Sequence, residues 1–195
     1  MQLKNIFAFI FLFTTFIFSH FSAQNISKSN LSNEEIEKRI DENSGNPAQM
    51  WELINFYISK SKKEQNSEAL FYAYRYASMA SNYPQNIKYA DTALVTASKS
   101  KVKKILLDAY LNRGNINMLE EFYEKALDDI LVANKLSQEY GNDYIFHKTI
   151  YIIAQNKIYL GHYEDAKKEL LICLQYFRNN LYNKSSLGEN YQMYY

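Results

Sequence analysis

The side chains able to bind a metal or perform catalysis are few in this chain of 195 residues, and their spacing gives them no common site. A metal ion needs several ligands that converge on one point. The chain has three histidines, His20, His147 and His162, and one cysteine, Cys173. His147 and His162 are expected at opposite ends of one long helix, and His20 belongs to an apolar N-terminal segment. We therefore predict no metal site and no cofactor.

Adjacent carboxylates could serve general acid–base catalysis, and they occur at Glu34-Glu35, Glu120-Glu121 and Asp128-Asp129. Neighbours on a helix point about 100° apart, so these pairs do not converge on one substrate atom. Acids in the first turn of a helix suit its dipole, which explains the first two pairs without chemistry. The chain has neither a glycine-rich phosphate loop nor a G-x-S-x-G nucleophile turn. The sequence predicts no catalytic residues and no enzyme.

Composition indicates one helical domain without a broad electrostatic partner. Hydrophobic residues make up 47% of the chain, and only five glycines and two prolines are present, too few for an all-β fold. The net charge of +1 gives no case for nucleic acid or an anionic membrane. A local basic run lies at Lys99, Lys101, Lys103 and Lys104. Such a run is usually solvated, and an acidic partner is the alternative.

The N-terminus has the pattern of an export signal. Lys4 precedes an apolar run from Ile6 to Phe18, which is too short for a bilayer-spanning helix. We predict a signal peptide over 1–23, cleaved after Ala23, and a linker over 24–31. An uncleaved membrane anchor is the alternative. The expected location is therefore the periplasm or the cell surface.

A repeated pattern governs the rest of the chain. Ala93, Ala133 and Cys173 recur at an offset of 40 residues, and so do three other sets of positions. These sets are Ala90, Ile130 and Leu170, then Tyr74, Gly114 and Ala154, and finally Leu70, Tyr110 and Ile150. Such periodicity is typical of stacked helical hairpins, each completed by its neighbours. We predict an all-α, right-handed solenoid of antiparallel helix hairpins with units of about 40 residues.

Local signals divide this solenoid into segments. Ser32 and Glu35 have the spacing of a capping box, Pro47 suits a first helical position, and Gly141 suits a left-handed cap. We expect helices over 67–81, 84–98, 103–115, 119–139, 143–160 and 163–178. The units are a divergent first hairpin over 32–66, repeats over 67–106, 107–146 and 147–186, and the start of an incomplete repeat over 187–195. That end leads us to expect a longer protein or a partner.

One motif gives the repeat a family resemblance. Gly161-His162-Tyr163-Glu164-Asp165-Ala166 resembles the G-x-Y-x-x-A turn and second-helix start of tetratricopeptide repeats. The resemblance implies that small and bulky residues pack the repeats together. These expected packing residues are Leu70, Ala90, Ala93, Tyr110, Gly114, Ala126, Ile130, Ala133, Ile150, Ala154, Tyr163, Ala166, Leu170 and Cys173.

The chain departs from that family in its period of 40 rather than 34, and in lacking the usual Trp and helix-ending Pro. A HEAT-like array has a similar period and is the structural alternative. An export signal before such units is also similar to the sensory half of bacterial membrane regulators that carry a cytoplasmic helix-turn-helix domain of the AraC type. That similarity rests on architecture alone.

The resemblance also implies a groove lined by the first helices of the hairpins. The residues that it places there are Phe71, Arg75, Leu111, Asn115, Met118, Tyr151, Gln155 and Tyr159. Rings, amides and an arginine on one face suit an extended peptide, because polar groups can bond its backbone while rings cover its side chains. Phe71, Leu111 and Tyr151 could equally belong to the core.

The sequence therefore predicts an exported, non-enzymatic module that binds a protein or peptide. It contacts a membrane only if the N-terminal segment is retained, and it binds no nucleic acid. The alternative function is a surface or periplasmic protein that captures a small molecule such as a glycan or nutrient. A third possibility is the sensory fragment of a longer transcriptional regulator.

Overall fold

The computed structural model describes residues 31–184, with the side chains described as far as residue 180, and this part of the chain is entirely helical. The predicted signal peptide, nearly all of the linker and the incomplete repeat over 187–195 lie outside the described residues. Eight helices follow one another in the described part: α2 (Asn33–Glu42), α3 (Pro47–Lys63), α4 (Ser67–Ala80), α5 (Gln85–Ala97), α6 (Lys103–Leu119), α7 (Tyr123–Tyr140), α8 (Asp143–Tyr159) and α9 (Tyr163–Lys184). None of these helices is long and apolar enough to cross a membrane. The predicted all-α class is confirmed.

The chain forms two compact units, Met1–Phe56 and Tyr57–Tyr195, with the boundary inside α3. In the first unit, α2 begins with the predicted capping box. The Glu35 amide donates to the Ser32 hydroxyl at 3.2 Å, and the Ser32 amide donates to the Glu35 carboxylate at 2.8 Å. Ile36 and Ile40, one turn apart, form the buried stripe of this helix. Pro47 is the first residue of α3, as predicted.

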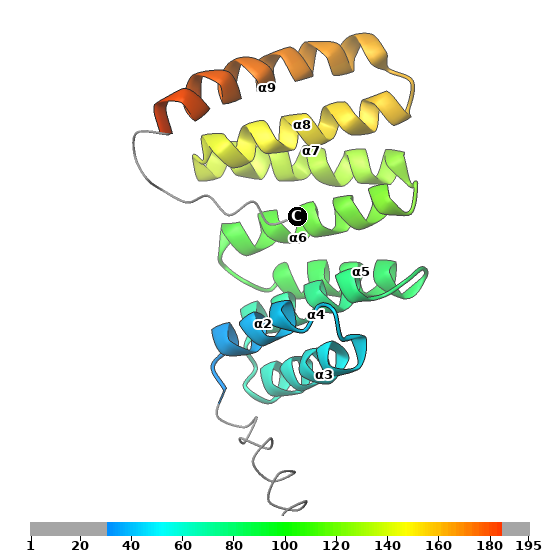
Figure 1. Ribbon diagram of the computed structural model, residues 1–195, viewed down its shortest axis with the longest axis vertical. Coiled ribbons are helices and arrows are strands. Elements are labelled where there is room, and N and C mark those ends of the chain that lie inside the picture. The colour runs from blue at the N-terminus through cyan, green and yellow to red at the C-terminus, as the bar shows by residue number, and fades with distance from the viewer. Residues whose placement is uncertain (1–30, 185–195) are drawn as a thin grey trace, which may run out of the picture. The chain divides into compact units, whose positions relative to one another are not determined.

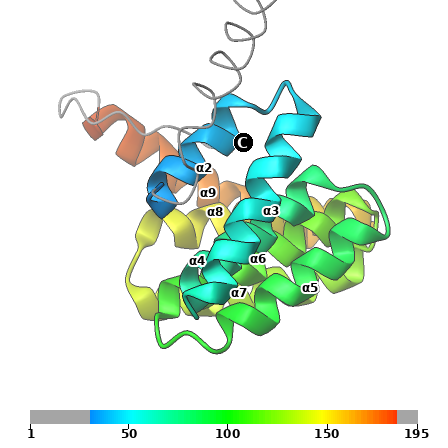
Figure 2. The same cartoon turned by 90° about the horizontal axis from the view of Figure 1, so that it is seen from below.

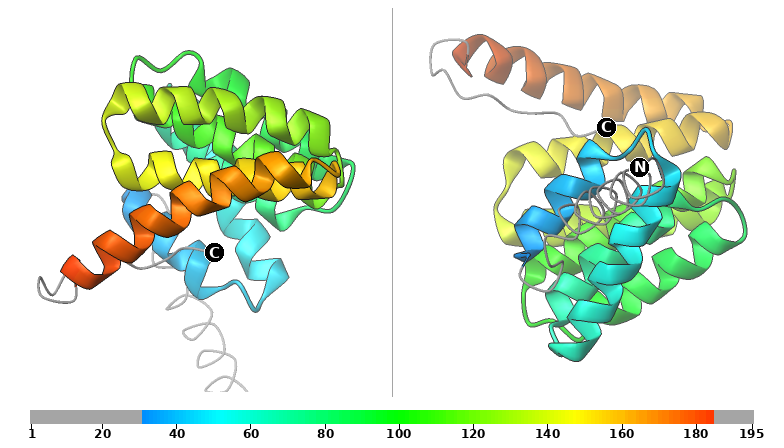
Figure 3. Two further views of the ribbon diagram at one scale, coloured as in Figure 1. Left: turned by 90° about the horizontal axis from the view of Figure 1, so that it is seen from above. Right: turned by 60° about the horizontal axis from the view of Figure 1, so that its bottom comes forward.

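In the second unit α4 to α9 stack in chain order as three antiparallel hairpins, α4–α5, α6–α7 and α8–α9 (Figure 1). Each helix packs on the next, which places every hairpin against its neighbour. Successive hairpins are rotated relative to one another. Seen from below, α9 runs at a clear angle to α5 (Figure 2). The view from above likewise shows α9 running obliquely across α8 (Figure 3, left). The tetratricopeptide-like solenoid is thus confirmed for this unit.

Glycines end two of the helices in the backbone conformation that the sequence indicates. Gly141 has a φ of 74° after α7, and Gly161 has a φ of 80° after α8. The left-handed region costs a glycine little because it has no Cβ. The turn from α6 to α7 contains no glycine, and Glu121 adopts a φ of 62° there. The expected helix start at Leu119 is therefore wrong, since Leu119 ends α6 and α7 begins at Tyr123. Glu120 and Glu121 lie in this turn rather than in a first helical turn.

The register of the first hairpin differs from the predicted period. The first helices of the hairpins begin at Ser67, Lys103 and Asp143, so their offsets are 36 and 40 residues. Both helices of the first hairpin are shorter, since α4 has 14 residues where α6 has 17 and α5 has 13 where α7 has 18, and longer turns make up only part of the difference. Burial agrees with the offset of 36, since Phe71 and Leu107 are both 0% exposed.

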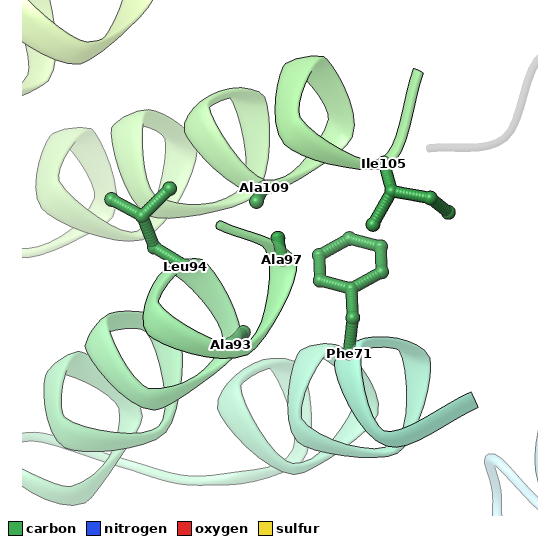
Figure 4. Close-up of a cluster of buried hydrophobic side chains, with 6 residues drawn as sticks. All are labelled: Phe71, Ala93, Leu94, Ala97, Ile105 and Ala109. Atoms are coloured by element: carbon green, nitrogen blue, oxygen red, sulfur yellow. The ribbon is translucent and has the colours of Figure 1, made fainter. Parts of the chain in front are cut away.

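This shift overturns the prediction that Phe71 lines a groove. Phe71 lies in the core among Ala93, Leu94, Ala97, Ile105 and Ala109, which come from α4, α5 and α6 (Figure 4). An alternation of one bulky ring with three alanines lets the three helices approach closely. The ring therefore contributes to stacking and is not available to a ligand.

Most of the expected packing residues are buried. Ala90, Ala93, Ala126, Ile130, Ala133 and Ala154 are 0% exposed, and Gly114, Ala166 and Cys173 are also buried. Leu70, Tyr110, Ile150 and Leu170 are half-buried. Tyr163 is the exception at 66% exposure, so its assignment to packing is wrong. Its equivalent Tyr123 is covered by Tyr159 of the next hairpin, and the described residues supply no such neighbour for Tyr163.

Candidate surface on the first helices of the hairpins

The first helices of the three hairpins are neighbours in space. α4 packs directly on α6 as well as on α5, whereas no comparable approach joins α5 to α7 within the described chain. Between α6 and α8 the Asn156 amide donates to the Met118 sulfur at 3.6 Å. α4 and α6 thus pack directly and α6 meets α8 through side chains, so the outer side chains of the three first helices can share one face.

The corrected register aligns the side chains of this face in two rows across the stack. With offsets of 36 and 40 residues, Arg75 aligns with Leu111 and Tyr151. One turn further along the helices, Met79 aligns with Asn115 and Gln155. We call these six residues the groove rows.

Exposure shows which members of the groove rows can meet a ligand. Met79 is 55% exposed and Tyr151 is 44% exposed, and Asn115 is also exposed. Arg75, Leu111 and Gln155 are half-buried. The Gln155 amide donates to the Tyr151 hydroxyl at 3.1 Å, which orients the ring and leaves the amide oxygen available. The rows thus offer one guanidinium, two amides and three apolar side chains.

Two predicted groove residues have other roles. Met118 is half-buried against a core cluster of Ile130, Ile152 and Ile153, and Leu111 packs partly on the same cluster. Tyr159 lies at the end of α8, where its ring stacks on Tyr123 at 4.6 Å. Among the predicted residues, the structure brings together Arg75, Leu111, Asn115, Tyr151 and Gln155. Phe71 is excluded as described above.

Met79 is the groove residue that sequence reasoning missed. A strict 40-residue period aligns Asn115 with Arg75 and leaves Met79 unassigned. The burial pattern carries the missing signal, because Ala69, Phe71 and Ala73 match Ile105, Leu107 and Ala109 at an offset of 36. The same bulky-small alternation is readable in the sequence.

A fixed charge pair borders the groove rows. The Lys104 ammonium donates to the Asp108 carboxylate at 2.7 Å, one turn along α6. Burial lowers the pKa of Lys104, but the hydrogen bond and charge of Asp108 outweigh it, and the pKa is raised. This lysine stays charged and does not act as a base.

A second charged cluster lies between the hairpins, away from the groove rows. Arg113 on α6 binds the buried Asp129 carboxylate through two hydrogen bonds of 2.9 and 2.6 Å. Its other terminal nitrogen reaches Asp91 on α5 at 3.1 Å. The hydrogen bond to Asp129 is the main reason that the pKa of Arg113 is raised. The cluster joins three helices, and three of the N–H donors of Arg113 bond to carboxylates of the protein itself.

The histidines and the cysteine make structural contacts. The His147 ring stacks on Tyr176 with centroids 3.7 Å apart, and the Cys173 thiol donates to the His147 carbonyl at 3.3 Å. Burial, and after it the charge of Glu169, raises the pKa of Cys173, so the thiol is held in its unreactive form. His162 is exposed in the turn before α9. Residues 31–184 contain no group of side chains arranged to hold a metal ion.

Comparison with known proteins supports the fold class. No protein-family model and no curated protein matches the chain. Among solved structures, the chain is similar to a signal-transduction ATPase with numerous domains (STAND) from Pyrococcus horikoshii, whose sensor is a tetratricopeptide repeat. The TM-score is 0.67 at 19% sequence identity, and the match covers 80% of this chain and 26% of that chain. The chain is therefore a tetratricopeptide-like helical-repeat module, and it spans about a quarter of the length of the protein it resembles.

Proposed function

We propose that the chain is a non-enzymatic module whose groove rows bind an extended peptide segment of a protein partner. The observation that carries this proposal is the alignment of Arg75, Leu111 and Tyr151 with Met79, Asn115 and Gln155 on adjacent helices. Exposed apolar side chains beside amides and a guanidinium can meet both the side chains and the polar backbone groups of a peptide. Amides can bond its backbone, and Met79 and Tyr151 can cover its side chains.

The similarity to a repeat sensor is consistent with a role in signalling. In the Pyrococcus horikoshii protein the tetratricopeptide repeat is described as the sensor of a larger signal-transduction ATPase. By analogy, the present chain would be the sensory part of a longer membrane-bound transcriptional regulator. The adjoining genomic sequence tests this context: a spanning segment followed by a helix-turn-helix domain supports it, and an immediate stop codon removes it.

Export is a further part of the proposal, and it rests on the sequence of residues 1–23. Expression with the native N-terminus followed by fractionation and N-terminal sequencing tests it. A mature chain that begins at Gln24 in the periplasm or on the cell surface is the expected product. A full-length chain in the membrane fraction would instead identify an uncleaved anchor.

The groove is tested with peptides selected by phage display against the whole chain. The double variant Arg75→Ala with Tyr151→Ala should weaken binding of a selected peptide about tenfold or more, because it removes a charged donor and a ring. Its melting temperature should stay nearly unchanged, since neither side chain is buried. Tyr140→Ala serves as the matched control, because Tyr140 is similarly exposed at 47% but ends α7.

Two outcomes would redirect this proposal. A loss of stability equal to the loss of binding would assign Arg75 and Tyr151 to the core. A thermal-shift screen that responds to sugars and not to selected peptides would favour the alternative function, capture of a glycan or nutrient.

A further inference from the structure

A row of aromatic rings runs along the edge of the stack where each hairpin turns. The three turns within the hairpins lie on the same side of the second unit, at the right in Figure 1. Tyr83 of the first turn contacts Phe122 of the second, with ring centroids 6.1 Å apart. Tyr123, the next residue, stacks on Tyr159 at the end of α8 with centroids 4.6 Å apart and planes within 7°. We call Tyr83, Phe122, Tyr123 and Tyr159 the turn row.

The rings of the turn row remain accessible although they touch one another. Tyr83 is 59% exposed, Phe122 36% and Tyr159 60%. Leu119, at the end of α6, aligns with Tyr83 and Tyr159 in the corrected register and is 70% exposed. Tyr163, which follows the third turn, is 66% exposed. Packing of the turns against one another does not require this much apolar surface to stay exposed to solvent. Such a concentration of aromatic faces is typical of an interaction surface.

The charges around the turn row are negative. The stretches 120–124 and 160–166 contain Glu120, Glu121, Glu124, Glu164 and Asp165, and they contain no lysine or arginine. Three lysines lie near the row and are already engaged. Lys125 lies over the Phe122 ring at 5.0 Å, Lys168 binds Asp165 at 3.0 Å, and Lys157 binds Glu169 at 2.6 Å. Lys88 and Lys167 lie further along their helices.

A cation already lies at one of these rings, and a carboxylate lies near another. Lys125 already makes a cation–π contact with one of them. Desolvation is the main cause of the raised pKa of Tyr123, and the second cause is the charge of Glu121, so a carboxylate lies near the stacked pair. Ring faces attract guanidinium groups more often than ammonium groups, because a planar guanidinium also stacks.

We propose that the turn row binds an extended, arginine-rich segment of a partner protein. The guanidinium groups stack on the exposed faces of Tyr83 and Tyr159 and hydrogen-bond to Glu121 and Glu164. This surface is separate from the groove rows, so one chain could hold two segments. Charge complementarity selects arginine over an acidic or neutral segment.

The experiment uses the 195-residue chain and a fluorescein-labelled octapeptide of alternating arginine and glycine. Fluorescence anisotropy should detect binding that weakens as salt rises from about 50 to 300 mM, since the contacts are exposed and charged. The matched peptide with glutamate in place of arginine should not bind. The lysine version should bind a few-fold more weakly than the arginine version.

Two double variants separate the parts of the proposal. Tyr83→Leu with Tyr159→Leu keeps the apolar contacts and removes the ring faces, and it should weaken binding about tenfold. Glu121→Gln with Glu164→Gln should weaken binding several-fold and reduce the salt dependence. Circular-dichroism melting confirms that each variant is folded, and Tyr83→Leu alone replaces the first pair if Tyr159→Leu unfolds the third hairpin.

The control pair is Tyr140→Ala with Asp143→Asn, at the end of α7 and the start of α8 on the opposite edge of the stack, which should leave the affinity unchanged. Arg75→Ala with Tyr151→Ala should also leave arginine-peptide binding unchanged, so failure of the groove proposal would not affect this result. Equal binding of the arginine and glutamate peptides, or wild-type affinity in the Tyr83→Leu/Tyr159→Leu variant, would overturn the inference. So would the absence of arginine-peptide binding at millimolar concentration.

Discussion

The second and third hairpins of the stack place a carboxylate at the same position and satisfy it differently. In the α6–α7 hairpin Asp129 accepts two hydrogen bonds from Arg113 and one of 3.1 Å from Asn117. In the α8–α9 hairpin the equivalent acid is Glu169, 40 residues later. Lys157, at the position of Asn117, binds it at 2.6 Å.

The difference lies in how completely each carboxylate is paired. Both oxygens of Asp129 have donors, whereas the second oxygen of Glu169 is buried without a hydrogen-bond partner. Ile153 stands where Arg113 stands in the preceding hairpin, so that position supplies no second donor to Glu169. The repeat therefore retains the position of the charge, but the interior hairpin fixes it more firmly than the last one. A buried charge is tolerated only to the extent that its neighbours satisfy it.

Removing the arginine should have the largest effect on stability. Arg113→Ala leaves the buried Asp129 with only Asn117, and it should lower the free energy of unfolding by about 3 kcal/mol. Lys157→Ala is the matched change in the third hairpin and should cost about 1 kcal/mol, because Lys157 and Glu169 are each about a fifth exposed. Urea unfolding followed by circular dichroism measures both.

A double variant tests whether the charge itself carries this effect. Arg113→Met with Asp129→Leu removes the whole pair and should recover most of the stability lost by Arg113→Ala. If Arg113→Ala and Lys157→Ala cost the same, the proposed difference between the two hairpins is wrong.

The same two hairpins differ in how closely their helices approach. A Cβ at Gly114 would lie 2.5 Å from the Ile130 Cδ1 and 2.8 Å from its Cγ1, whereas Ala154 occupies the equivalent place in the third hairpin. Gly114→Ala should lower the unfolding free energy by about 1 kcal/mol, because overpacking outweighs the gain in helix propensity. Adding Ile130→Val removes the clashing methyl and should restore part of it. A stabilising Gly114→Ala would show that Ile130 can move freely.

The sequence predicted the fold well and the groove only in part, and the first hairpin shows why. Helix caps at Ser32 and Gly141 depend on neighbouring residues alone, so they could be read directly. The period of 40 held from α6 onwards, where α7 has 18 residues. It failed for α4 because α4 and α5 are both shorter than α6 and α7, so Phe71 lies in the core and not in the groove.

Other features could not be predicted because they depend on contacts between hairpins. Nothing near Asp129 in the sequence indicates that Arg113, 16 residues earlier, would bind it, and the pair with Asp128 was assessed only as a possible catalytic pair. The turn row was missed for the same reason. Tyr83 and Phe122 meet only when two turns lie on one edge of the stack.

The smallest expected effect concerns Cys173, which occupies the position of Ala133 in the preceding hairpin. Burial raises the pKa of this thiol, so folding favours the protonated form. Its contribution to stability is complete below the pKa of the unfolded thiol and is lost as pH rises through the folded pKa. Between about pH 8 and 10, wild-type protein should therefore lose slightly more unfolding free energy than Cys173→Ala. At pH 7 the variant should lose less than about 1 kcal/mol, because alanine already fills this position in the second hairpin. If the unfolding free energies of the two proteins change with pH in parallel, the role of burial at Cys173 is wrong. The third hairpin would then be less tightly packed around this thiol than the structure indicates.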